Sequence, residues 1–107
     1  MWVAVSDGDD ALGVFMLNPL NCICYEVHTA LLPEAWGRSV EITKAGVRWL
    51  FKNTPCRRVI TNVPEYNRKA LILAKKTGMV QFGVNTKSFL KNGVLYDQIM
   101  LGLSKED

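Results

Sequence analysis

The sequence is poor in histidine and cysteine, and this scarcity excludes several kinds of protein. His28 is its only histidine, and its three cysteines, Cys22, Cys24 and Cys56, include no second close pair. A structural zinc site needs about four Cys or His ligands at regular spacings, so no metal site is expected. The cysteine count is odd, and Cys22 and Cys24 lie on one face of a predicted strand. Reduced thiols are therefore expected in place of a disulfide framework.

Long apolar runs are missing as well. No run reaches the roughly 18 residues that a membrane-spanning helix needs, and the amino terminus lacks the basic-then-apolar layout of a signal peptide. The sequence therefore predicts a cytoplasmic protein with no membrane partner.

A large excess of one charge is also absent. Thirteen basic residues stand against ten acidic ones, a net charge of +3, and the surplus gathers at residues 57–58, 68–69 and 75–76. Such pairs suit an anionic ligand or form an ordinary solvated surface, and both interpretations stay open. No aromatic stacking platform accompanies them, which disfavours nucleic acid as a partner.

What is present is the composition of one folded domain. The chain has 107 residues, 49% apolar and 21% charged, so residues 1–107 are expected to form a single domain. Strand formers dominate residues 2–5, 12–17, 22–31, 58–63, 80–90 and 94–103. Turn residues at Asp7-Gly8-Asp9-Asp10 and Asn92-Gly93 predict that the first two and the last two segments are hairpins.

Two helices interrupt the strands. Residues 39–51 carry apolar side chains at helical spacing, with Ser39 as the expected N-cap. A second helix is expected from Asn67 to a left-handed Gly78. The first helix allows the strands on either side of it to run parallel. The predicted order is β-β-β-α-β-α-β-β, an α/β (α+β) fold.

Three segments resemble a known superfamily: EVHTALLPE at residues 26–34, NVPEYNRKA at residues 62–70 and KKTGM at residues 75–79. They are similar to the GNAT superfamily, the Gcn5-related N-acetyltransferases, and to its branch of ribosomal-protein and spermidine N-acetyltransferases. The resemblance spans about residues 2–103 and implies a GNAT-like mixed sheet. It also implies that the first strand and two helices of the family, which wall its acceptor site, are lacking.

The phosphate loop departs from the family pattern. That loop reads Arg/Gln-x-x-Gly-x-Gly/Ala, whereas residues 36–41 here read WGRSVE. Ser39 can donate a hydrogen bond to phosphate, but Glu41 would repel an anion held at the start of the helix. Arg38 offsets this repulsion by pairing with either the phosphate or Glu41, and the sequence leaves both pairings open.

The resemblance implies acetyl-CoA as the cosubstrate. It assigns coenzyme contacts to Thr29, Leu31, Trp36, Gly37, Arg38, Ser39, Val40, Asn62, Asn67 and Ala70. Backbone N–H groups around Thr29 and Leu31 would polarise the thioester carbonyl. Asn67 is equally suited to capping its own helix, and the two roles are compatible.

Two side chains are candidates for acid–base chemistry. Glu26 and His28 are two positions apart on one strand, so they share a face and together suit a base with a water relay. The tyrosine that many resembling enzymes use as an acid falls at Ala74. The alternatives are Tyr25, Tyr66 and Tyr96. Packing within the fold is the competing role for these rings.

Two functions are consistent with these patterns. The first is an acetyl-CoA-dependent N-acetyltransferase that acts on a primary amine of a protein or small molecule. The second is a catalytically inactive GNAT-fold binding or assembly module, similar to GNAT-like proteins encoded in phage and prophage genomes. A homodimer is a further candidate, because residues 2–5 would form an exposed apolar edge strand and a second chain could supply the missing half.

Overall fold

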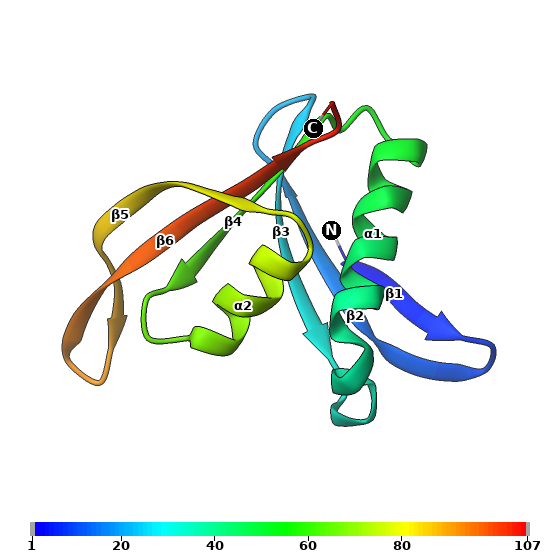
Figure 1. Cartoon of the computed structure of the whole chain (residues 1–107), viewed down its shortest axis with the longest axis horizontal. Helices are drawn as coiled ribbons and strands as arrows, with labels where there is room; N and C mark the ends of the chain where they lie inside the picture. Colours follow the sequence, from blue (N-terminus) through cyan, green and yellow to red (C-terminus); the bar gives the residue numbers. More distant parts are fainter. Residues whose placement is uncertain (1, 107) are drawn as a thin grey trace.

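A computed structural model describes residues 2–106, which form six strands and three helical segments (Figure 1). The strands are β1 (Trp2–Asp7), β2 (Asp10–Pro19), β3 (Cys24–Leu31), β4 (Arg58–Pro64), β5 (Val80–Lys91) and β6 (Val94–Ser104). The helical segments are the 3₁₀-helix η1 (Pro33–Arg38) and the α-helices α1 (Ser39–Asn53) and α2 (Arg68–Lys76). The predicted order and the mixed α+β class are confirmed, and η1 is an addition to them.

All six strands join one mixed sheet in the order β1-β2-β3-β4-β6-β5. Both predicted hairpins are present as antiparallel neighbours, β1 with β2 and β5 with β6. In the second hairpin, Asn92 and Gly93 have φ angles of 52° and 77°, which a two-residue turn requires and which these residue types tolerate. Because β6 lies between β4 and β5, the last of the six described strands is internal to the sheet.

β3 and β4 run parallel, as predicted, but they pair only briefly. Within residues 2–106 their pairing extends from Cys24↔Arg58 to Glu26↔Ile60, three residue pairs in all. Beyond this point the two strands diverge, while β3 stays paired with β2 and β4 with β6 (Figure 1). The sheet therefore consists of a β1–β3 half and a β4–β6 half with a V-shaped opening between them.

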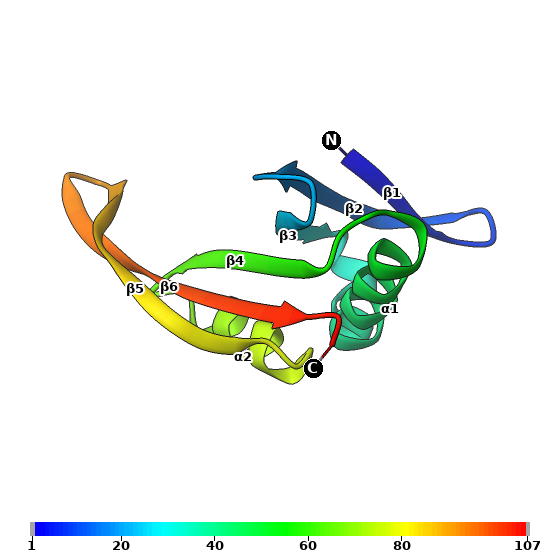
Figure 2. The ribbon, with the colours of Figure 1, turned by 90° about the horizontal axis from the view of Figure 1, so that it is seen from above.

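Both α-helices pack on the same face of this sheet (Figure 2). The core between them is formed by Leu17, Val27, Val47, Leu50, Cys56, Val59, Val63, Ala74, Met79 and Leu101. Because side chains alternate along a strand, the neighbours of Val27 and Val63 point to the opposite face, which we call the open face. No helix within residues 2–106 combines the length and apolar character needed to cross a membrane.

The helix ends show two correct predictions and one error. Asn67 caps α2 as expected, with its Oδ1 accepting the Ala70 N–H at 3.2 Å, and Gly78 follows α2 with φ of 100°. The prediction of Ser39 as an N-cap was wrong. Ser39 is the first residue of α1, with helical angles of −59° and −41°, because η1 leads directly into α1 and the Ser39 N–H already bonds to the Trp36 carbonyl.

Candidate functional site

A cavity of about 220 Å³, here called the cleft cavity, lies in the opening between β3 and β4. It is lined by Val27, His28, Thr29, Thr43, Thr61, Asn62, Val63, Pro64, Asn67, Ala70, Leu73, Ala74, Thr77 and Met79. Val27 and Val63 lie on the helix side of the sheet, whereas His28 and Asn62 alternate with them on the open face. The cleft cavity therefore passes between the strands and is lined by side chains from both faces.

Glu26, Asn62 and His28 form a polar cluster on the open face beside this cavity. Asn62 Nδ2 donates a hydrogen bond to Glu26 Oε2 at 2.6 Å, across the opening. His28 Nε2 lies 3.9 Å from Glu26 Oε1, and the two side chains are 38% and 22% exposed. One carboxylate oxygen is thus fixed by Asn62, while the other faces His28. A carboxylate held in this way can accept a proton from a bound amine.

Two backbone N–H groups of β3 face the opening. The Leu32 N–H donates to the Leu12 carbonyl of β2 at 2.8 Å. N–H directions alternate along a strand, so those of Leu31 and Thr29 point the other way, toward β4. β4 does not pair with this part of β3, as the ladder of the described residues ends at Glu26. These two positions are those expected to polarise a thioester.

The first turn of α2 borders the same cavity. Asn67 and Ala70 both line it, so the structure brings them together with Thr29 and Asn62. Ala74, at the expected tyrosine position, is buried in the cavity wall and has no group that ionises. Within residues 2–106, no tyrosine lines the cleft cavity.

The tyrosines pack elsewhere in the fold. The Tyr66 and Tyr96 ring centroids are 4.7 Å apart, and Phe89 lies 6.2 Å from Tyr66. The Lys91 ammonium sits 4.7 Å from the Tyr66 ring centroid. Tyr25 packs against the hydrophobic core. These contacts support a packing role for the rings.

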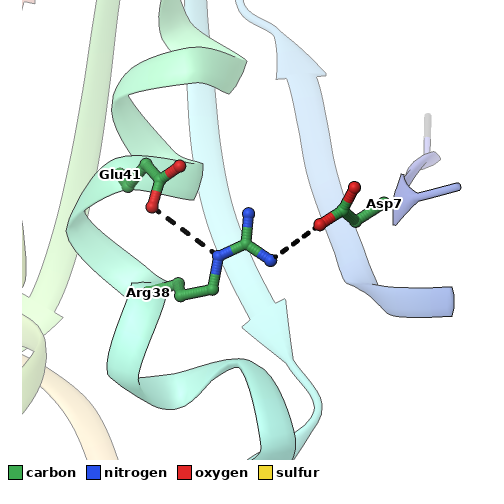
Figure 3. A network of polar contacts seen from close by, with 3 residues as sticks. All are labelled: Asp7, Arg38 and Glu41. Atoms are coloured by element: carbon green, nitrogen blue, oxygen red, sulfur yellow. Dashed lines mark hydrogen bonds and ion pairs between the residues drawn. The ribbon is translucent and has the colours of Figure 1, made fainter.

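The expected phosphate loop is the 3₁₀-helix η1 and the first turn of α1, and here Arg38 is held by two carboxylates (Figure 3). Arg38 Nη1 lies 3.1 Å from Asp7 Oδ2, and its Nε lies 3.6 Å from Glu41 Oε2. The pKa of Arg38 is raised above its ordinary value, mainly by the hydrogen bond to Asp7 and to a smaller extent by the hydrogen bond to Glu41. The sequence left open whether Arg38 pairs with a phosphate or with Glu41. The structure shows the pairing with Glu41, together with a second pairing to Asp7.

The other loop residues lie outside the lining of the cleft cavity. Trp36 is 61% exposed, and its Nε1 donates to the Leu31 carbonyl at 3.0 Å, which ties η1 to the end of β3. Gly37 and Val40 line a shallow groove on the surface of α1. None of residues 36–40 lines the cleft cavity.

A second cavity, of about 410 Å³, lies between α1 and the β1–β2 hairpin. It shares Val27, Thr29 and Thr43 with the cleft cavity and has Arg38 in its wall. Thr43 Oγ1 and Asn62 Oδ1 are buried without a hydrogen-bond partner in the described part of the chain. Both atoms belong to residues that line the cleft cavity, so the wall of this cavity contains two polar groups that have no hydrogen-bond partner within residues 2–106.

Sequence reasoning missed two residues of this region. Asp7 stands in a run of turn formers, and its contact with Arg38 joins positions 31 apart, so no local pattern indicates it. Thr43 carried a usable signal, because it is a polar residue next to Ile42 on the apolar stripe of a helix.

Solved structures of acetyltransferases share this fold. A chimera of the Vibrio cholerae spermidine N-acetyltransferase SpeG with hSSAT has a TM-score of 0.88 at 20% identity, covering 98% of this chain and 66% of that one. The Vibrio cholerae spermidine N-acetyltransferase in complex with CoA and spermine has a TM-score of 0.83 at 19% identity, with 94% and 62% covered. A GNAT-family acetyltransferase from Bacillus anthracis has a TM-score of 0.82 at 17% identity, with 94% and 62% covered.

The chain spans less than two thirds of the length of these three structures. At such identities the likeness establishes the GNAT-like fold. No curated protein matches the chain significantly. A family model described as "Protein of unknown function (DUF2824)" matches residues 1–107, so the chain belongs to the DUF2824 family.

Proposed function

We propose that this protein is a cytoplasmic acetyl-CoA-dependent N-acetyltransferase that acetylates a primary amine of a small molecule or a protein. The observation that carries the proposal is the opening between β3 and β4. There, Thr29 and Asn62 line the cleft cavity, Asn62 holds the Glu26 carboxylate, and the N–H groups of Thr29 and Leu31 point toward β4.

In the proposed reaction, Glu26 accepts a proton from the ammonium form of the acceptor, directly or through a water beside His28. The neutral nitrogen attacks the thioester carbonyl carbon, whose oxygen is polarised by the N–H groups of Thr29 and Leu31. The C–N bond forms and the C–S bond breaks. The departing sulfur takes the second amine proton and leaves as a thiol.

Spermidine and spermine are the first acceptors to test, because one related structure is a spermidine N-acetyltransferase bound to CoA and spermine. Glu26→Gln removes the proposed base but keeps an oxygen for Asn62, so kcat is expected to fall about 100-fold. Coenzyme binding, measured by calorimetry, is expected to stay unchanged. Glu34→Gln alters an exposed carboxylate of η1 and is the matched control.

Chromatographic assay of acetylated product separates the outcomes. Wild-type turnover that is lost in Glu26→Gln and kept in Glu34→Gln supports the proposal. Equal turnover in both variants contradicts the role of Glu26. Absence of turnover and of coenzyme binding in the wild-type protein contradicts the enzyme proposal as a whole.

A second candidate function is an assembly module that forms a homodimer. The observation in its favour is β1, an edge strand of the sheet whose Trp2 is 66% exposed. If two copies pair through β1, Trp2→Lys is expected to shift a dimer to monomers in light scattering. Trp49→Lys, at a 48% exposed tryptophan of α1, is expected to leave the dimer intact. A wild-type protein that stays monomeric at high concentration contradicts this candidate.

A further inference from the structure

We infer that the donor site recognises the pantetheine arm of its thioester and gains no affinity from the pyrophosphate and nucleotide. This inference rests on the proposed function and names the part of the donor that its site recognises. The donor class is then pantetheine thioesters in general, of which acetyl-CoA is one.

The first reason lies in the backbone at the start of α1. A helix N-terminus binds phosphate through several N–H groups that have no other partner. Here the chain enters α1 through η1, where the Ala35 N–H bonds to the Leu32 carbonyl at 2.9 Å and the Ser39 N–H bonds to the Trp36 carbonyl. These two N–H groups are therefore bonded within the loop.

The second reason is the charge at this position. Asp7 and Glu41 both contact Arg38, so two carboxylates surround one guanidinium and leave one negative charge in excess (Figure 3). A pyrophosphate that approached Arg38 would meet both carboxylates, and Glu41 lies in the first turn of the helix, where it repels an anion. Lys44 and Arg48 line a shallow groove on α1 together with Arg38 and Glu41, and none of these four residues lines the cleft cavity.

The third reason is that the cleft cavity suits an uncharged arm. Pantetheine is a chain of methylene groups with two amides, which needs apolar walls and a few hydrogen-bonding partners. The cavity has apolar walls such as Val63 and Ala70, together with the unpaired Thr43 Oγ1 and Asn62 Oδ1. Asn62 Oδ1 can accept an amide N–H, and the Thr43 hydroxyl can donate to an amide carbonyl. None of these contacts involves Arg38.

Calorimetric titration of the wild-type protein with CoA and with pantetheine tests the inference without turnover. The two dissociation constants are expected to agree within about three-fold. They are also expected to change little between about 0.05 and 0.5 M salt, because no phosphate contact is screened. CoA binding more than about ten-fold tighter than pantetheine overturns the inference and leaves the proposed function standing. If neither compound binds, both fail.

Two variants sharpen this test. The double variant Asp7→Asn, Glu41→Gln releases Arg38, so CoA is expected to bind about ten-fold tighter while pantetheine binding is unchanged. Glu34→Gln is the control and is expected to change neither. Thr43→Val is expected to weaken CoA and pantetheine equally, by about ten-fold, because it removes a contact to the shared arm. A loss confined to CoA in Thr43→Val contradicts the assignment, and circular dichroism verifies folding.

Discussion

Cys56 shows how burial controls a single side chain in this protein. It is 1% exposed, and its thiol donates to the Arg58 carbonyl at 3.3 Å. Burial raises the pKa of the folded thiol above its ordinary value of 9.0. The folded protein therefore keeps this proton at a pH where the unfolded chain has lost it, and Cys56 is expected to react with thiol reagents far more slowly than the exposed Cys22.

The same shift predicts a loss of stability in alkali. Below pH 9 both states hold the proton, and the contribution of Cys56 is complete. As pH rises past 9, the unfolded chain ionises first, so the free energy of unfolding falls until the folded thiol also ionises. Denaturant titrations between about pH 8 and 10 measure this. Cys56→Ala is expected to lower the free energy of unfolding at pH 7. It is also expected to reduce the fall of this free energy between about pH 8 and 10. An unchanged slope contradicts the prediction.

Single residues of the site were predictable only where the signal is local. The alternation of a strand placed Glu26 and His28 on one face, and the distance of 3.9 Å between His28 Nε2 and Glu26 Oε1 fits that expectation. Asn62 reaches Glu26 from 36 positions away, so its partner could not be predicted from spacing. The same holds for Asp7 at Arg38, which decides the charge of the loop.

Among the elements, β2 depends on one glycine where it approaches β3. Gly13 has φ of 151°, and a Cβ there would lie 2.3 Å from the Ala30 carbonyl oxygen and 2.7 Å from Leu31 Cα. Both neighbours are backbone atoms, so they cannot move aside without disturbing the pairing. Gly13→Ala is expected to destabilise the fold by about 2 kcal/mol or more.

Gly37 provides the matched control for this prediction. A Cβ there meets no atom within 4 Å, and Gly37 has no positive φ. Gly37→Ala is expected to change the free energy of unfolding by less than about 0.5 kcal/mol. Urea denaturation of the two variants measures the difference. Equal stability would show that β2 and β3 can separate at no cost.

The elements were predictable to the extent that their chemistry is local. Asn92-Gly93 indicated a hairpin and Asn67 a cap, and both are present because the residue types themselves favour these geometries. The 3₁₀-helix η1 was missed, since Pro33 and Gly37 are equally typical of an irregular loop. That omission led directly to the wrong cap at Ser39.

At the scale of the whole molecule, the two halves of the sheet meet through only three residue pairs within residues 2–106. Backbone N–H groups of β3 that face the opening beyond these pairs are therefore expected to exchange readily with solvent. The Ala30 N–H points to β2, whereas those of Thr29 and Leu31 point to the opening. Amide exchange followed by NMR is expected to be fast at Thr29 and Leu31 and slow at Ala30. Added coenzyme is expected to slow only the first two. Uniform exchange along β3 contradicts this geometry.

The position of β6 inside the sheet also sets the order in which the protein can fold. β4 pairs with β3 at three positions but with β6 at seven, from Arg58↔Ser104 to Pro64↔Gln98. During synthesis, β4 gains its main neighbour only after β6 has been made. Such pairing between distant segments is slow. The β4 wall of the opening therefore becomes fixed only when residues 94–104 have left the ribosome. Deletion of these residues is expected to abolish this wall.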